Sequence, residues 1–300
     1  MDYQSILKKL MKEDERFVVM TAENRALLRD FPDKLEDRFV DTGITEQALI
    51  GSGAGLALRG RIPVIHALAA FLSMRCFEFV RTDAGFPNLP LKLVAFIPGL
   101  LSEGNGPTHQ AIEDVSIMRG IPNVHVFCPA NAQDCTIGLE KVLKSPNPTY
   151  IRYNTRQTEF KHSTDFEIGK AEIISKGEDV TLLVYGTLFE EALKTKEMLE
   201  AKGIKTGLMN LRMVKPLDEA AILDAVENTK NLVTIEDHFL TGGLFTAVSE
   251  LLVKNNKSIP VLPISLEDHW FKPVQLDKIL ELEGFTPEKM SEKIQNKFFK

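Results

Sequence analysis

Residues 41–47 read Asp41-Thr42-Gly43-Ile44-Thr45-Glu46-Gln47 and lie between a predicted strand, residues 38–41, and a predicted helix, residues 46–59. The glycine turn brings Glu46 to the first turn of that helix, just beyond the carboxyl end of the strand. Open α/β sheets place their ligand sites at this end of the strands. A glutamate in the first turn of a helix also complements the helix dipole without any ligand. This stretch alone therefore leaves both a binding role and a structural role open for Glu46.

Short apolar, β-branched segments alternate with amphipathic segments on both sides of this stretch. Such alternation predicts an α/β fold with two mostly parallel sheets and helices on both faces. In the first half we expect strands at 17–20, 38–41, 62–65, 91–96, 124–127 and 150–153, and helices near 46–59, 71–84, 110–119 and 131–144. In the second half we expect strands at 180–185, 206–210, 231–235 and 260–263, helices near 188–202, 218–227 and 243–254, and a helical tail over 275–300.

A polar stretch over residues 155–165 has no clear period and predicts a linker. The expected organisation is a first domain over residues 1–156, a linker over 157–166 and a second domain over 167–300. Neither half contains a phosphate-binding loop or a dinucleotide glycine fingerprint after a strand.

Composition excludes several classes of protein. A net charge of −6 provides no basic footprint for nucleic acid. No apolar run reaches the roughly 18 residues that predict a membrane span, and residues 1–16 lack the apolar core of a signal peptide. Cys76, Cys128 and Cys135 show no metal-ligand spacing and are expected to be buried thiols in a reducing compartment. We therefore expect a cytoplasmic protein without a metal site of its own.

A second glycine-rich stretch, residues 104–110, reads Gly104-Asn105-Gly106-Pro107-Thr108-His109-Gln110. Two glycines and a proline shape a loop after the predicted strand that ends at Phe96, and we expect His109 at the start of the next helix. A lone histidine is most often structural or solvated. A histidine on such a loop is better suited to binding an oxygen-rich substrate.

These stretches occur in a fixed order with several others. Glu113-Asp114, Arg119-Gly120-Ile121-Pro122-Asn123 and Cys128-Pro129-Ala130-Asn131 follow His109, and the whole order over residues 15–156 resembles the pyrimidine-binding region of transketolases. The second half resembles the transketolase C-terminal domain through Tyr185-Gly186-Thr187, Lys215-Pro216-Leu217-Asp218, Glu236-Asp237-His238 and Gly242-Gly243-Leu244.

The resemblance implies a site for thiamine diphosphate. In transketolases the glutamate that matches Glu46 hydrogen-bonds a pyrimidine nitrogen and favours the imino tautomer, which requires a carboxyl group shielded from water. His109 matches a histidine beside the bound ketose, so Glu46 and His109 are the implied catalytic residues. Phe71 matches part of the wall around the pyrimidine. Glu23 falls where the family has an aspartate near the thiazolium, although an exposed charge before a helix is an equally good explanation.

Three positions depart from the family pattern. Leu68 stands where a phenylalanine stacks on the pyrimidine, which removes a stacking contribution of about 0.5–1.5 kcal/mol. Asn105 replaces an aspartate that contacts donor hydroxyls, and Ile97 replaces a histidine associated with sugar phosphates. Arg156 lies near a family arginine that binds phosphate. We therefore expect Leu68 at the cofactor and Asn105, Arg156 and His109 at a sugar or sugar-phosphate substrate, and we hypothesise an atypical ketose or acceptor.

The chain has no Gly-Asp-Gly motif to hold a metal-bound diphosphate. In the family this motif lies on the other half of the enzyme. The resemblance therefore implies the C-terminal subunit of a split transketolase, which transfers a two-carbon ketol unit from a ketose to an aldose. The implied partner is the N-terminal subunit, which would hold Mg²⁺ or Ca²⁺ in an α2β2 assembly.

Three alternatives remain open. The β subunit of a 2-oxo acid dehydrogenase shares the fold and the glutamate, but it usually has Gln-His-Ser where this chain has Thr108-His109-Gln110. The fused synthase of deoxyxylulose phosphate shares Thr-His-Gln but carries its diphosphate domain on the same chain. A paralogue that binds or regulates without catalysis is favoured by the three departures, whereas the retained Glu46 and His109 oppose it.

Overall fold

The computed structural model describes residues 2–22, 27–28, 31, 37–270 and 272–300. One sheet contains β1 (Phe17–Thr21), β2 (Phe39–Asp41), β3 (Ile62–Leu68), β4 (Lys92–Phe96), β5 (His125–Phe127), β6 (Thr149–Tyr153) and β10 (Met213–Lys215). The other contains β7 (Glu172–Ser175), β8 (Val180–Val184), β9 (Thr206–Asn210), β11 (Leu232–Phe239) and β12 (Val261–Leu266). The strand orders are β10-β5-β6-β4-β3-β1-β2 and β12-β11-β8-β9-β7. Neighbouring strands are parallel except at the edges formed by β10 and β7.

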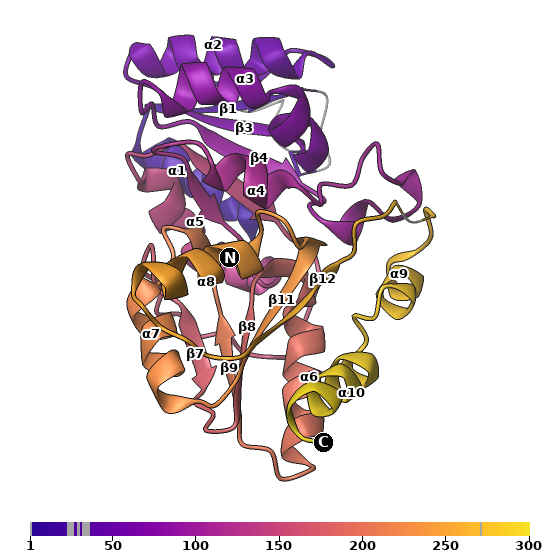
Figure 1. Ribbon diagram of the computed structural model, residues 1–300. Helices are drawn as coiled ribbons and strands as arrows, with labels where there is room; N and C mark the ends of the chain where they lie inside the picture. The colour runs from indigo at the N-terminus through magenta and orange to yellow at the C-terminus, as the bar shows by residue number, and fades with distance from the viewer. Residues whose placement is uncertain (1, 23–26, 29–30, 32–36, 271) are drawn as a thin grey trace.

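Helices cover both faces of the first sheet (Figure 1). Helices α1 (Tyr3–Glu13) and α5 (Ala132–Lys144) pack on one face, and α2 (Glu46–Leu58) and α4 (Asp114–Arg119) pack on the other. Strand β1 shows the division, because Phe17 and Val19 contribute to the core under α1 whereas Val18 and Met20 contribute to the core under α2. This alternation follows from the two-residue period of a strand.

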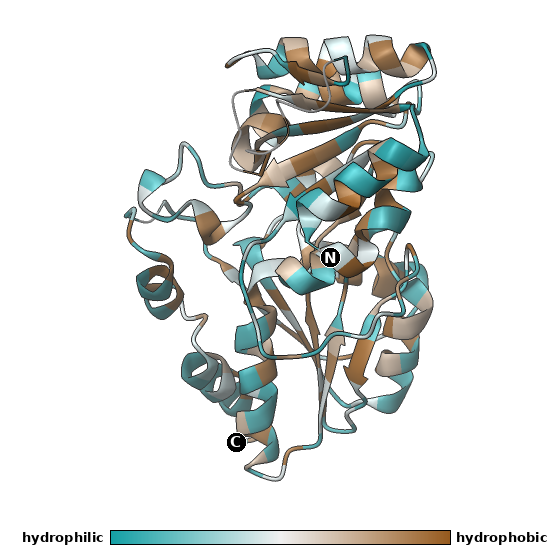
Figure 2. Ribbon diagram, turned by 180° about the vertical axis from the view of Figure 1, so that it is seen from behind, coloured by the Kyte–Doolittle hydropathy of each residue, from teal (hydrophilic) through white to brown (hydrophobic). Residues whose placement is uncertain are grey.

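The second sheet is layered in the same way. Helices α6 (Phe189–Glu200), α9 (Leu276–Leu282) and α10 (Pro287–Phe298) contribute to one core, and α7 (Glu219–Asn228) and α8 (Leu244–Lys254) lie on the opposite face. The core under α7 and α8 is continuous with the core under α2, so one apolar layer runs through both sheets. Figure 2 shows many hydrophobic residues along the strands, whereas the surrounding helices carry both hydrophobic and hydrophilic residues. None of the helices that the structure describes is long and apolar enough to cross a bilayer.

The predicted α/β class, with two mostly parallel sheets, is confirmed. Helix α1 and strands β7 and β10 were not predicted. Strand β10 comes from the second half of the chain but pairs with β5 of the first sheet. A three-residue edge strand has no period that could reveal it. Gly53 lets α2 approach the first sheet closely, because a Cβ atom there would lie 2.7 Å from Ile65 Cδ1.

The segment predicted as one helix over residues 71–84 is instead built of wide turns. The π-helical turns η1 (Phe71–Arg75) and η2 (Val80–Gly85) flank the short α3 (Phe77–Phe79). Bonds from Cys76 N to Phe71 O and from Phe86 N to Arg81 O span five residues each. Such wide turns are frequent at functional sites.

Candidate functional site

The predicted site residues follow the carboxyl ends of neighbouring strands. Glu46 begins α2 after β2, Leu68 ends β3 and Phe71 follows it, and His109 lies on the loop after β4. Glu23 follows β1 but lies outside the described residues. Since these strands run parallel, the segments after them meet at one edge of the sheet, where α/β proteins bind ligands.

Glu46 is a buried carboxylate, only 3% exposed, in the first turn of α2. Its Oε2 atom accepts a hydrogen bond from Arg75 Nη1 at 2.8 Å. Burial raises the pKa of the neighbouring Cys76 thiol to about 12, and the negative charge of Glu46 adds to that increase. A buried carboxylate is costly unless it is paired and hydrogen-bonded, and Arg75 supplies this contact.

Phe71 links Glu46 to His109 through the same arginine. The guanidinium carbon of Arg75 lies 4.0 Å from the centroid of the Phe71 ring. The His109 ring meets Phe71 edge to face, with 5.2 Å between centroids. The structure therefore brings Glu46, Phe71 and His109 into one continuous group. Sequence reasoning missed Arg75, although an arginine four residues after Phe71 on a helical segment is placed to contact that ring.

The loop that carries His109 is strained. Ile97 and Glu103 have positive φ values of 50° and 44°, which are uncommon for residues other than glycine and rarer still for a β-branched one. Each such conformation costs about 1–3 kcal/mol and is typical of ligand-binding sites. The expectation that His109 starts a helix is wrong. Its N–H donates to Gly106 O in a turn, and α4 begins only at Asp114 because a backbone bridge at residue 111 intervenes.

The other predicted residues lie around this group in different settings. Leu68 is half-buried and pairs with Phe96 of β4. Asn105 is exposed, and its amide donates to Ser102 Oγ at 3.4 Å. Arg156 lies against α6, where both terminal nitrogens donate to the Glu191 carboxylate at 2.8 and 2.7 Å. Burial opposes the charge of Arg156, but the contacts with Glu191 raise its pKa overall.

A buried ion-pair cluster anchors the base of the His109 loop. Arg152 of β6 donates from Nε to Asp114 Oδ2 and from Nη1 to Asp237 Oδ1, each at 2.9 Å. Its Nη2 donates to Ala111 O, and Ala111 O in turn accepts from the backbone N–H of Gly99. Asp237 belongs to β11, so this cluster, which we call the Arg152 cluster (Arg152, Asp114 and Asp237), also joins the two sheets. Burial works against the charge on Arg152, but the two aspartates hold its pKa well above the usual value.

Two family models match the chain. The model described as the pyrimidine binding domain of transketolase matches residues 2–160, and the model described as its C-terminal domain matches residues 169–290. The chain belongs to the transketolase family.

Several transketolase relatives match nearly the whole chain. A putative transketolase C-terminal section from Methanocaldococcus jannaschii is 32% identical over 99% of this chain and 95% of its own length. The 6-deoxy-6-sulfo-D-fructose transketolase subunit SqwH from Clostridium sp. (strain MSTE9) is 33% identical over 95% of this chain and 89% of its own length. A solved split gene transketolase, described as an inactive β4 tetramer, is 32% identical with a TM-score of 0.87, covering 98% and 95% of the two chains. The predicted resemblance to a split transketolase is therefore confirmed.

The transketolase family implies thiamine diphosphate, and the residues around Glu46 fit its aminopyrimidine half. That half needs a buried hydrogen-bonding carboxylate beside an aromatic face. The Arg75 guanidinium is itself planar, donates to Glu46 and lies over Phe71. The space between these two side chains therefore accommodates a flat hydrogen-bond donor. The chain lacks a Gly-Asp-Gly motif, so the fit extends to the aminopyrimidine and not to the diphosphate.

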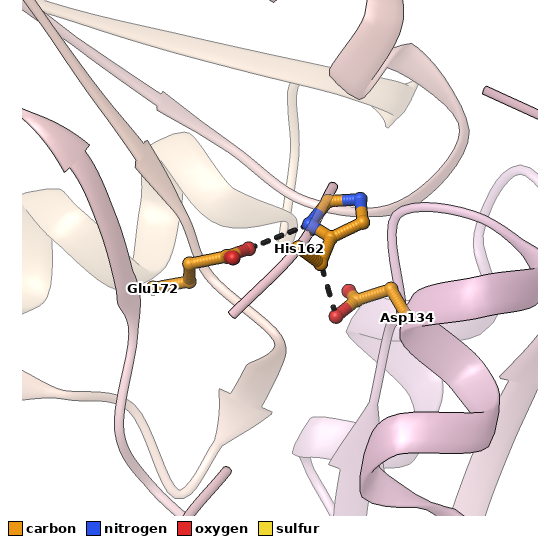
Figure 3. A group of neighbouring side chains, drawn as sticks. All are labelled: Asp134, His162 and Glu172. Carbon is orange, nitrogen blue, oxygen red and sulfur yellow. Dashed lines mark hydrogen bonds and ion pairs between the residues drawn. The ribbon is translucent and has the colours of Figure 1, made fainter. Parts of the chain in front are cut away.

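A second buried polar group of this transketolase chain has the composition of a metal site (Figure 3). Ligand atoms of Asp134, His162 and Glu172 lie within 4.8 Å of one another. However, Arg212 Nε donates to Asp134 Oδ1 at 2.7 Å, so a guanidinium already offsets part of the negative charge of this group. The oxygen of the Asn131 amide accepts from Asp134 N, which leaves its nitrogen to donate to His162 Nε2, while His162 Nδ1 donates to Glu172. This network binds α5, the segment around His162 and β7 together without requiring a metal.

Proposed function

We propose that this chain is the pyrimidine-binding, C-terminal subunit of a thiamine diphosphate-dependent transketolase. With a partner subunit it transfers a two-carbon ketol unit from a ketose to an aldose. The observation that best supports this function is the buried Glu46 at the start of α2, grouped with Phe71 and His109 beyond the ends of parallel strands.

Each side chain has a distinct role in this proposal. When bound, thiamine diphosphate would supply the carbanion chemistry that the transfer needs. The Glu46 carboxylate shares a proton with a pyrimidine ring nitrogen, in a setting where burial strengthens the hydrogen bond. Phe71 covers the pyrimidine edge and excludes water. The Nδ1 atom of His109 lies 2.9 Å from Thr108 Oγ1, so its Nε2 atom is the one that contacts oxygens of the substrate.

Exposed apolar side chains before α2 and along the α3–η2 segment support the need for a partner. Ile44 is 68% exposed two residues before Glu46, and Phe86 is 87% exposed after η2. Phe77 and Phe79 of α3 are also exposed. Apolar surface of this kind marks protein interfaces. We propose that the subunit carrying the diphosphate site and Mg²⁺ or Ca²⁺ covers it, in an assembly with two copies of each chain.

We propose that the substrate of this chain and its partner is an atypical ketose. One relative is described as acting on 6-deoxy-6-sulfo-D-fructose, which carries a sulfonate in place of a phosphate. Asn105 and Ile97 occupy positions at which transketolases read hydroxyls and phosphate. Arg156, the candidate anion binder, is engaged by Glu191 in this subunit. A screen with xylulose 5-phosphate, fructose 6-phosphate and the sulfonated ketose tests this, and full activity on both standard phosphates would refute it.

The proposed function is tested by reconstitution with the diphosphate-binding subunit. The wild-type pair should bind thiamine diphosphate and release an aldose from a ketose donor. Glu46→Gln keeps the size of the side chain but removes its charge, and it should lower kcat by about 100-fold or more. Glu292→Gln on the exposed face of α10 is the matched control and should keep normal turnover. Normal turnover by Glu46→Gln would refute the role of Glu46, and a pair that binds no cofactor would favour a non-catalytic paralogue.

A further inference from the structure

Arg75 is the residue at the candidate site that neither the family pattern nor the proposed reaction uses. It extends from the end of η1 across the Phe71 ring to the Glu46 carboxylate, with contacts of 4.0 Å to the ring centroid and 2.8 Å to Oε2. Glu46 is 4% exposed at its side chain, whereas Arg75 is 39% exposed. The arginine therefore covers the buried acid from the solvent side.

The contacts of Arg75 reproduce those expected of an aminopyrimidine. A guanidinium is planar, presents only N–H donors and stacks on aromatic rings. A pyrimidine bound for catalysis is also flat, also hydrogen-bonds the Glu46 carboxylate and also lies beside Phe71. The 4.0 Å separation between the guanidinium carbon and the ring centroid is van der Waals contact. No second flat group fits between them.

The contact has a physical reason in a subunit without a partner. A buried carboxylate with no cation or donor is strongly unfavourable, and Arg75 satisfies Glu46 when no cofactor is present. For the arginine itself the exchange costs little, because its partly exposed head can return to water and its stem is unbranched.

We propose that Arg75 is a placeholder: it fills the aminopyrimidine half-site of the unassembled subunit and must leave Glu46 before thiamine diphosphate binds. This inference rests on the proposed function. Cofactor binding is then an exchange, in which the aminopyrimidine replaces Arg75 as the hydrogen-bond partner of the Glu46 carboxylate. The subunit thereby stays stable alone while its half-site is closed to free pyrimidines.

Titration calorimetry of thiamine diphosphate and Mg²⁺ into the reconstituted pair tests the placeholder. Arg75→Met retains an unbranched stem but cannot pair with Glu46, so the cofactor no longer has to displace a competitor. Its Kd should fall about fivefold, the factor expected for a partly exposed ion pair. Arg75→Lys keeps the charge without the planar fork and should give an intermediate Kd. Arg59→Met, at the exposed carboxyl end of α2, removes the same charge and should leave the Kd unchanged.

Thermal unfolding of the free subunit gives a second readout. Arg75→Met should unfold at a lower temperature than both wild type and Arg59→Met, because Glu46 stays buried without its cation. Unchanged or weaker cofactor binding by Arg75→Met would refute the proposal. Arg75 would then be a residue that stabilises Glu46 in the cofactor-bound enzyme. If Arg75→Met does not fold, Arg75→Lys is measured instead. A Kd below that of wild type would support the proposal, and an equal or higher Kd would refute it. A wild-type pair that binds no cofactor would refute the proposed function and the placeholder together.

Discussion

Replacing Arg152 with methionine tests whether the Arg152 cluster holds the two sheets and the His109 loop together. The substitution keeps an unbranched apolar stem and removes the donors to Asp114, Asp237 and the Ala111 carbonyl. The side chains of all three cluster members are 1% exposed or less, so water cannot replace the lost donors.

The magnitude follows from what remains buried. Removing one partner of a buried ion pair costs about 3–5 kcal/mol, because the other charge stays behind. Arg152→Met leaves two such carboxylates. Asp114 keeps a hydrogen bond from Tyr150 Oη at 2.9 Å, whereas Asp237 Oδ2 already has no partner among the described residues. We therefore expect a loss near the upper end, about 5 kcal/mol, which is comparable with the whole stability of some domains.

Urea unfolding followed by circular dichroism measures this loss. The control is Arg16→Met, because Arg16 pairs with Asp14 at the surface with 63% of its side chain exposed and such pairs contribute about 1 kcal/mol or less. The unfolding midpoint of Arg152→Met should fall far more than that of Arg16→Met. A triple variant that also carries Asp114→Asn and Asp237→Asn should recover part of the loss, since no charge stays buried. Equal midpoints for the two single variants, or no recovery in the triple variant, would refute the reasoning.

Two further predictions concern pH and the backbone. Burial lowers the pKa of His66 from its ordinary value of 6.5 to about 4, so the folded state keeps it neutral while the unfolded chain takes up a proton. His66 should therefore cost the protein about 3 kcal/mol of stability as the pH falls from 7 to 4, and acid unfolding of His66→Gln should lack this component; parallel losses in both proteins would contradict it. Gly99 has a φ of 59°, and a Cβ atom there would lie 1.7 Å from Asp237 Oδ2. Gly99→Ala should lower the free energy of unfolding by about 2 kcal/mol or more, whereas Gly104→Ala, where a Cβ atom meets nothing within 4 Å, should match wild type in the same urea titration.

Much of the fold could be predicted because its signals are local. Apolar runs with strand or helix period predicted the α/β class, and the glycine turn before Glu46 fixed the start of α2 after β2. In a parallel sheet, residues that follow strands share one edge whatever their separation in sequence. The sequence therefore also indicated that Glu46, Phe71 and His109 lie close together. Strands β7 and β10 were missed because they are short and lie at sheet edges. Helix α1 was also missed, although its buried residues Tyr3, Ile6, Leu7, Leu10 and Met11 recur at helical spacing.

Contacts between distant residues had no such signal. The pairs Glu46–Arg75 and Arg152–Asp237 join residues 29 and 85 positions apart. Arg156, which stays a predicted substrate contact, pairs with Glu191, 35 positions away. The ordered motifs of the sequence by themselves indicated the family by resemblance. Periodicity and turn chemistry, which act over a few residues, determined the α/β class and placed Glu46 and Phe71 just after predicted strands. Only the tertiary structure decided which charges meet. Each buried charge is satisfied by whichever partner the packing of the two sheets brings within hydrogen-bond distance, and no local pattern records that choice.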